Sequence, residues 1–248
     1  MKAICYQRNK FKDKFPYFGL WCYMGKFGSG KTLTSVMQVK DICEEYPKCR
    51  LVTNTIIKGI NNKTFLFQNA DELVQIIMEN VKENDEDGWI IFVDEIHAVL
   101  TDIFARGLGG ETFLAYLSQL RKISMMIIGT SQLYNKCNKT IREYLRLNGN
   151  IVFCKKIFWA ITINQFVDME TCEENSKNNL NYEIAKWSWY FHTIELYESY
   201  ESFALVSQIK NLLKKEMKEN GNQLPGNNQS ICPDNRSMPT NGVDTGTM

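Results

Sequence analysis

The sequence predicts an α/β fold in which helices flank a mostly parallel sheet. Two apolar runs indicate strands buried on both faces, because strands of a parallel sheet read as continuous rather than alternating apolar stretches. One run lies within residues 88–95 and ends in Asp94 and Glu95, and the other lies within residues 124–132. The third observation is the glycine-rich segment 25–32, which joins an apolar segment of strand length to an apolar-periodic helix start.

Segment 25–32 matches the pattern G-x-x-x-x-G-K-[ST] without a mismatch, so the fold class is that of a P-loop NTPase. In such a loop the backbone N–H groups surround phosphate oxygens, and the helix N-terminus adds partial positive charge. We expect ATP as the nucleotide, with Lys31 at its β- and γ-phosphates and Thr32 on Mg²⁺. The alternative is a Gly-Ser turn that precedes Lys-Thr by chance, and the flanking strand and helix disfavour it. The residues assigned to nucleotide binding are Gly25, Gly28, Ser29, Gly30, Lys31 and Thr32.

Asp94 and Glu95 follow a buried strand, and ligands of open α/β sheets bind at the carboxyl ends of strands. We therefore expect both carboxylates beside the P-loop. Asp94 is assigned, with Thr32, to Mg²⁺, which it would hold through a water. Glu95 is assigned as the general base that polarises the attacking water. Alternatively, the pair only caps the helix that follows. His97 is expected to pack near the site rather than to take part in catalysis.

The strand within 124–132 ends in Thr130, Ser131 and Gln132. An amide at this edge of the sheet can contact the γ-phosphate and the attacking water. Gln132 is therefore the second residue assigned to catalysis.

The other elements are predicted from periodicity, caps and turn residues. Helices are expected over 31–45, after the cap Asn69, over 111–122 and within 133–147. Strands are expected over 50–54 and 64–67, twice within 151–163, and at 192–197 as the closing strand. Residues 101–110 are expected to form a loop.

The domain prediction divides the chain into a lead-in over 1–14, an ATPase domain over 15–210 and a short helix over 211–219. Residues 220–248 are predicted to be a disordered tail. They are rich in Asn, Gly, Ser, Pro and Thr, and their few apolar residues cannot offset the entropy lost on ordering.

The composition excludes several classes of protein. A formal charge of +1 over 248 residues does not indicate a globally nucleic-acid-binding chain, so contact with DNA must come from a local patch or an assembled ring. Eight cysteines without a C-x-x-C pair, and only two histidines, give no metal-site spacing and fit a reduced, cytoplasmic compartment. No apolar run reaches the roughly 18–20 residues that span a bilayer, so no intrinsic membrane span is expected.

The order of the motifs resembles the N-terminal ATPase domain of zonula occludens toxin-like proteins, which include the filamentous phage assembly ATPases. The same motifs resemble the wider FtsK–HerA group, to which viral DNA-packaging ATPases belong. The resemblance spans about residues 15–205. Its motifs are the P-loop 25–32, LVTN at 51–54, IIFVDE at 90–95, LRK…MMIIGTSQ at 120–132 and LYESYES at 196–202.

The resemblance implies a RecA-like sheet in which the Gln132 strand lies between the P-loop strand and the Asp94–Glu95 strand. It also implies a ring, usually a hexamer, with ATP between subunits and an arginine finger supplied by the neighbour. Gln132 matches the sensor glutamine of the family. Arg121 is the first choice for the finger and the third residue assigned to catalysis, with Arg142 and Arg146 as alternatives. Arg121 could instead pair with a surface carboxylate.

The combined prediction is a Mg²⁺-dependent ATPase motor in the host cytoplasm that translocates viral DNA into a capsid, with capsid or assembly proteins as partners. Filamentous phage assembly ATPases continue into a membrane-spanning helix and an outer domain. Neither is expected from this sequence unless it is a fragment, so extrusion across a membrane is the second choice. An ATP-binding scaffold or switch with negligible turnover is the alternative from another class. A GTPase is disfavoured because the sequence has no Asn-Lys-x-Asp, and a small-molecule kinase because residues 101–123 contain only two arginines.

Overall fold

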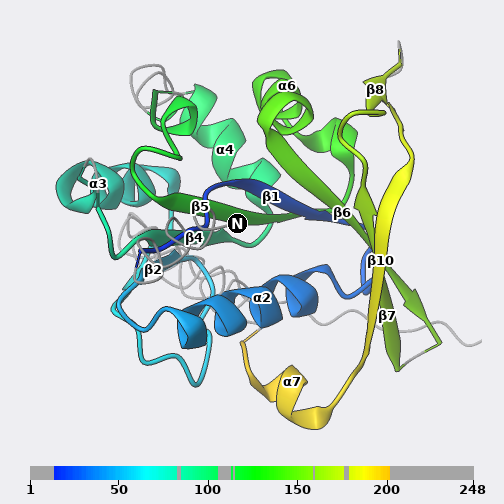
Figure 1. Cartoon of the computed structure of the whole chain (residues 1–248), viewed down its shortest axis with the longest axis horizontal. Coiled ribbons are helices and arrows are strands. Elements are labelled where there is room, and N and C mark those ends of the chain that lie inside the picture. Colours follow the sequence, from blue (N-terminus) through cyan, green and yellow to red (C-terminus); the bar gives the residue numbers. More distant parts are fainter. Residues whose placement is uncertain are drawn as a thin grey trace, which may run out of the picture. The chain divides into compact units, whose positions relative to one another are not determined.

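A computed structural model of the chain describes residues 14–82, 85–105, 113, 115–158, 160–175 and 179–201 (Figure 1). All of them belong to one unit, which ends at Leu205. The helix expected over 211–219, the tail expected over 220–248 and all but the last residue of the lead-in over 1–14 lie outside the described residues.

An eight-stranded, mostly parallel sheet forms the centre of the fold, as predicted. Its strand order is β10-β7-β6-β1-β5-β4-β2-β3, and only the pairs β6–β7 and β7–β10 are antiparallel. Strand β5 lies between β1 and β4, as the resemblance implied. The strands are β1 Gly19–Met24, β2 Arg50–Thr53, β3 Thr64–Leu66, β4 Trp89–Val93, β5 Met125–Ser131, β6 Gly149–Ile157, β7 Ile161–Val167 and β10 Ile184–Phe191. A separate pair is formed by β8 Glu173–Glu174 and β9 Leu180–Asn181.

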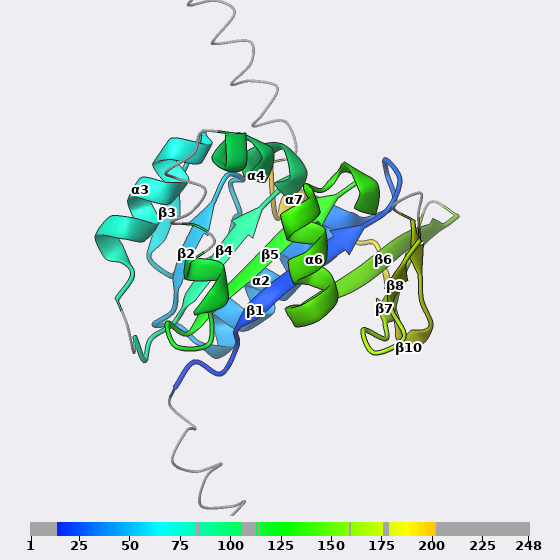
Figure 2. The ribbon, with the colours of Figure 1, turned by 90° about the horizontal axis from the view of Figure 1, so that it is seen from above.

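Helices cover both faces of the sheet, which explains the continuous apolar runs. Helix α2 (Lys31–Glu45) lies on one face, and α3 (Ala70–Asn80), α4 (Ile96–Ala105) and α6 (Lys139–Asn148) lie on the other (Figures 1 and 2). Alternate residues of β4 therefore enter two different cores. Ile90 and Phe92 belong to the core that contains α2, and Ile91 and Val93 belong to the core that contains α3 and α4. A short 3-10 helix, η1 (Tyr134–Lys136), and α7 (Ile194–Glu198) complete the elements.

The cap of α3 forms as predicted. The Asn69 side chain accepts a hydrogen bond from the backbone N–H of Glu72, at 3.0 Å. The Glu72 carboxylate reaches back to the backbone N–H of Gln68, so the two side chains satisfy donors at the start of the helix reciprocally.

The prediction of a loop over 101–110 is wrong for residues 101–105, which form the second half of α4. Ile96 and Ile103 are buried in the core, and Val99 packs against it. This spacing keeps one helical face on the sheet. Residues 106–110 lie outside the described residues. In the expected helix over 111–122, residues 113 and 115–118 are helical and turns follow from 119 to 124.

The closing strand expected at 192–197 is also wrong. The closing strand is β10, and residues 194–198 form α7, whose cap Thr193 accepts from the backbone N–H of Leu196. The sequence pattern of β10 is unusual for an edge strand because large aromatic residues lie on its exposed side. Trp187, Trp189 and Phe191 alternate along it and are all more than half exposed. In the part of the chain that the structure describes, no helix has the length and apolar character needed to cross a membrane.

Candidate functional site

The P-loop joins the carboxyl end of β1 to the first residue of α2. Gly30 caps α2 with φ of 93°, a left-handed conformation that favours glycine. A Cβ at this position would lie 2.3 Å from Thr162 Oγ1 on β7, so a larger residue has neither the conformation nor the space. The P-loop therefore packs directly against β7, in the antiparallel part of the sheet.

Lys31 is held at the bottom of the site. Its side chain is 8% exposed, and its Nζ lies 4.0 Å from Glu95 Oε1, which exceeds hydrogen-bonding distance. Phe27 lies on the other side of the ammonium, whose Nζ is 5.7 Å from the ring centroid. A buried cation with so loose a counter-ion is suited to an anionic ligand.

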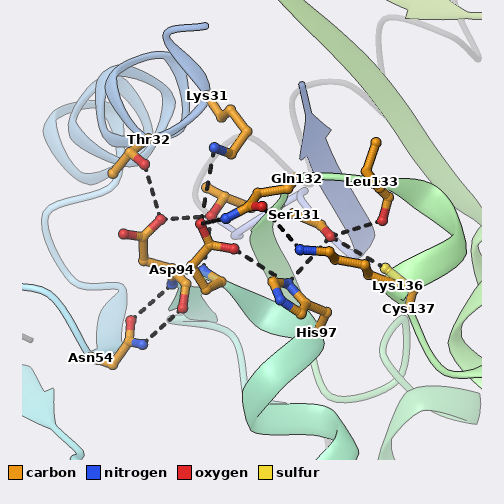
Figure 3. A network of polar contacts seen from close by, with 12 residues as sticks. Lys31, Thr32, Asn54, Asp94, His97, Ser131, Gln132, Leu133, Lys136 and Cys137 are labelled. Atoms are coloured by element: carbon orange, nitrogen blue, oxygen red, sulfur yellow. Dashed lines mark hydrogen bonds and ion pairs between the residues drawn. The ribbon is translucent and has the colours of Figure 1, made fainter. Parts of the chain in front are cut away.

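Asp94 is fixed by three neighbouring elements (Figure 3). Its Oδ1 accepts from Thr32 Oγ1 at 3.0 Å and from Thr130 Oγ1 at 2.6 Å. The Asn54 side chain binds the Asp94 backbone twice, accepting from its N–H at 2.8 Å and donating to its carbonyl at 3.0 Å. Thr32 and Asp94, the two residues assigned to Mg²⁺, are therefore hydrogen-bonded to each other, and the Asn54 side chain holds the Asp94 backbone in place.

Glu95 has a left-handed backbone, with φ of 54°. Such a conformation costs a residue other than glycine about 1–3 kcal/mol and is found mainly at functional sites. The Glu95 N–H donates to Thr130 Oγ1 at 2.9 Å, which links this turn to β5. Gln132 Nε2 lies 3.5 Å from Glu95 Oε1, and Lys136 Nζ donates to Gln132 Oε1 at 3.0 Å. The structure thus brings Lys31, Glu95 and Gln132 together, as the sequence predicted.

His97 Nδ1 lies 3.3 Å from Glu95 Oε2. Burial lowers the pKa of His97, an effect that the Glu95 charge opposes and that Lys136 and Lys31 reinforce. His97 therefore lies directly beside Glu95, and its Nδ1 is also 3.4 Å from Ser131 Oγ.

Two buried oxygen atoms at the site have no hydrogen-bond partner among the described residues, namely Ser29 Oγ and Glu95 Oε2. Unsatisfied buried polar atoms are costly, and both atoms lie where the P-loop meets the strand ends. The Ser29 hydroxyl and the buried Lys31 ammonium can donate to a phosphate ligand, whereas the Glu95 carboxylate oxygen can accept from a water. Thr32 and Asp94 fit Mg²⁺, which usually takes one or two protein oxygens and completes its shell with phosphate and water. Within the described ranges, no group of three His, Cys, Asp or Glu forms an all-protein metal site.

A cavity of about 270 Å³ extends from these residues. Asp94 and Glu95 line one side and P-loop residues line the base. Its remaining walls come from segments to which the sequence assigned no role, through Lys156, His192, Tyr197 and Tyr200. Asn54 and Thr130 were also missed as site residues. Asn54 ends a motif of the resemblance, and that position was the only available signal.

The three candidate arginines lie apart from this cavity. Arg121 precedes β5, whereas the site lies at the other end of that strand, roughly 20 Å away for seven residues. The exposed Arg121 guanidinium sits 5.8 Å from the Phe18 ring centroid. Arg142 is buried, pairs with Glu174 at 3.0 Å and donates to the Cys137 carbonyl at 2.8 Å, so it has a structural role. Arg146 lies in the last turn of α6.

Comparisons with known proteins agree with this architecture. Among solved structures, the chain is similar to the N-terminal domain of zonular occludens toxin from Neisseria meningitidis, at 20% identity and a TM-score of 0.47. That match covers 75% of this chain and 100% of the other.

Two further similar structures are EccC of Thermomonospora curvata (ATPases 2 and 3, in complex with a signal sequence peptide) and the flagellar accessory protein FlaH of Methanocaldococcus jannaschii. EccC is 12% identical with a TM-score of 0.47, and the match covers 63% of this chain and 36% of that one. FlaH is 10% identical with a TM-score of 0.45, and the match covers 72% of this chain and 95% of that one.

No curated protein matches the chain significantly. The profile of the ATPase family associated with various cellular activities (AAA) matches residues 21–154, more than half of the chain, and the protein belongs to that family.

Proposed function

We propose that the chain is a Mg²⁺-dependent ATP hydrolase. The observation that carries this proposal is the convergence of Lys31, Glu95 and Gln132 beside the Thr32–Asp94 pair. A protein that only binds nucleotide needs no base, whereas here the Glu95 carboxylate lies beside Lys31, Gln132 and His97 next to the P-loop.

Each residue has a role that follows from its contacts. Lys31 offsets phosphate charge, and Thr32 and Asp94 would hold Mg²⁺, which supplies Lewis-acid stabilisation of that charge when bound. Glu95 Oε1 or Oε2 accepts the proton of the attacking water. Gln132 orients Glu95 through its amide N–H and is itself oriented by Lys136.

We propose further that hydrolysis drives translocation of DNA, and that the motor packages a viral genome into a capsid in the host cytoplasm. The support is the motif resemblance, in particular the segments 51–54, 120–132 and 196–202. The six cysteines of the described ranges are all buried and free, which fits a reduced compartment. A ring is part of this proposal, and Arg121, which lies too far from its own cavity to act there, would act as a finger only in the cavity of a neighbouring copy.

Steady-state ATP hydrolysis with and without double-stranded DNA tests both proposals. Glu95→Gln is expected to lower kcat by about 10²- to 10⁴-fold, the usual contribution of a general base, while ATP binding is retained. Glu143→Gln, the same change at an exposed position on α6, serves as the control and is expected to leave the rate unchanged. If Glu95→Gln turns over as fast as the wild type, the catalytic assignment is wrong.

The DNA arm gives a separate answer. DNA is expected to stimulate hydrolysis, and if it neither stimulates nor binds at low salt, the translocase proposal fails while the ATPase proposal stands.

Mixing Glu95→Gln with Arg121→Ala tests the ring. Each variant alone is expected to be nearly inactive, and mixed rings are expected to regain activity because an intact Glu95 can meet an intact Arg121 from a neighbour. The gene neighbourhood separates packaging from extrusion, since a double-jelly-roll capsid gene favours the first and small helical coat genes favour the second.

A further inference from the structure

The cavity has two chemically different ends. One end is lined by Asp94 and Glu95, the carboxylates that must lie near the γ-phosphate if hydrolysis takes place there. The P-loop forms the middle, where the α2 N-terminus and Lys31 meet phosphate. The other lining residues are Lys156 at the end of β6, His192 just after β10 and Tyr197 of α7. In the strand order, β6 and β10 lie on the opposite side of β1 from β4, so this part of the lining is taken as the opposite end. Given the proposed function, the direction of the nucleotide is therefore determined, and its nucleoside must point toward this opposite end.

This end is an ordered cluster of side chains. The His192 imidazole bridges two hydroxyl groups, with Nε2 2.7 Å from Thr162 Oγ1 and Nδ1 in contact with Tyr197 Oη. Lys156 Nζ donates to the same Tyr197 oxygen at 3.2 Å. The His192 ring also stacks on Tyr190, with ring centroids 5.5 Å apart. The Tyr197 ring is thus oriented by contacts at its hydroxyl group, by the Lys156 ammonium 5.8 Å from its centroid and by the His192 ring, which meets it edge-on with centroids 5.3 Å apart. The ring still lines the cavity.

The backbone around Tyr197 is held from a second direction. The Ser199 carbonyl accepts from the N–H of Lys58 at 2.7 Å, and the N–H of Glu201 donates to the Ile56 carbonyl at 3.1 Å. A bridge between Ile57 and Tyr200 lies between these bonds. The segment that carries Tyr197 is therefore hydrogen-bonded to the connection that follows β2. Even so, the Tyr197 side chain remains 46% exposed, which is unusual for an aromatic ring with this many fixed contacts.

We infer that Tyr197, Lys156 and His192 form the nucleoside subsite, in which the base stacks on the Tyr197 ring. Lys156 contacts the adjoining phosphate and ribose, and His192 is a positioning residue that orients Tyr197. An aromatic face offers stacking to any base, and an ammonium beside it offsets phosphate charge. This inference rests on the proposed nucleotide site. It also gives a role to the tyrosine of the LYESYES segment at 196–202.

Equilibrium binding of MgADP and of Mg-tripolyphosphate to the full chain, measured by titration calorimetry, tests the inference without requiring turnover. Tripolyphosphate fills the phosphate end but has no base or ribose. Tyr197→Ala is expected to weaken ADP roughly 5- to 100-fold, the range expected from removing one base-stacking contact, and to leave tripolyphosphate within about twofold. Tyr197→Phe keeps the ring and is expected to bind ADP more tightly than Tyr197→Ala does.

Phe158→Ala is the matched control. It removes an aromatic ring that is 84% exposed, two residues from Lys156 and not part of the cavity wall, and it is expected to bind both ligands like the wild type. The inference is overturned if Tyr197→Ala binds ADP like the wild type, or if ADP and tripolyphosphate weaken equally, which would indicate a general collapse of the site. If Tyr197→Ala does not fold, Tyr197→Leu, which keeps an apolar side chain without an aromatic face, is judged by the same two ligands. If the wild type binds neither ligand, the proposed function itself fails.

Discussion

Glu95 combines a reactive side chain with an unfavourable backbone conformation. Its φ of 54° lies in the left-handed region, and its N–H is committed to Thr130 while α4 starts at the next residue. The turn is therefore imposed by the strand before it, the helix after it and the neighbouring strand. A carboxylate is present here despite the strain, which supports a role in function rather than in stability.

This strain can be measured by comparing two truncations. Glu95→Gly and Glu95→Ala both remove the carboxylate, and both are expected to abolish measurable ATP turnover. Glycine accepts the left-handed conformation without strain, so Glu95→Gly is expected to be more stable than Glu95→Ala by about 1 kcal/mol. Urea unfolding of the two variants gives this difference directly. Equal stabilities would show that the backbone at this turn is not strained.

The elements were most predictable where the sheet is buried on both faces. Apolar runs predict strands β1, β4 and β5. The glycine-rich turn before residue 31 and Pro47 after residue 45 predict the two ends of helix α2. The edge of the sheet was less predictable. Strand β10 carries aromatic residues on its exposed side and polar residues on its inner side, so a rule that places apolar residues inward misreads it. Helix α7 is only five residues long, and its position depends on tertiary contacts rather than on periodicity.

The packing of α4 on β5 depends on one glycine. A Cβ at Gly129 would lie 2.5 Å from Ile96 Cδ1 and 2.8 Å from its Cβ, and Ile96 is the residue that follows Glu95. The absence of a side chain at 129 therefore allows α4 to approach the sheet and places the Asp94–Glu95 turn beside Thr130.

Gly129→Ala is accordingly expected to lower the free energy of unfolding by about 1–3 kcal/mol, the usual cost of overpacking, and to reduce turnover by displacing Glu95. Ile96→Ala removes Cδ1 and Cγ2 and keeps Cβ, so it relieves part of the clash, at the separate cost of a cavity. The double variant is expected to be more stable than the sum of the two single effects, because the substitutions share one contact. Chemical denaturation of all four proteins completes the cycle, and strict additivity would contradict the proposed contact.

At the scale of the whole molecule, the phosphate end of the site could be predicted from sequence and the nucleoside end could not. Residues 25–32 form one continuous motif, and Asp94, Glu95 and Gln132 each end an apolar strand. By contrast, Lys156, His192 and Tyr197 come from three different elements and carry no shared pattern. They meet only because β6, β7 and β10 fold back beside the P-loop.

The chain has two histidines, and burial lowers the pKa of both in the folded state, as do lysine neighbours of each. Because the unfolded imidazoles bind protons at about 6.5, protonation favours the unfolded chain. The free energy of unfolding is therefore expected to fall as the pH drops through about 6.5 toward the lowered folded values. Urea unfolding at pH 7.5 and pH 5.5 measures the loss, and the variant with both His97→Gln and His192→Gln is expected to lose less. The same loss in that variant would assign the effect to other groups.

The two sides of β10 give the protein an optical property. On its inner side, Tyr190 Oη lies 3.0 Å from Thr34 Oγ1 in α2, one turn from the P-loop lysine. On its outer side, Trp187 and Trp189 are 55% and 63% exposed, whereas Trp89 is buried. Iodide is therefore expected to quench the emission of Trp187 and Trp189 more strongly than that of Trp89. Any movement of the strand on nucleotide binding should change that emission, so a single turnover could be followed without an added label.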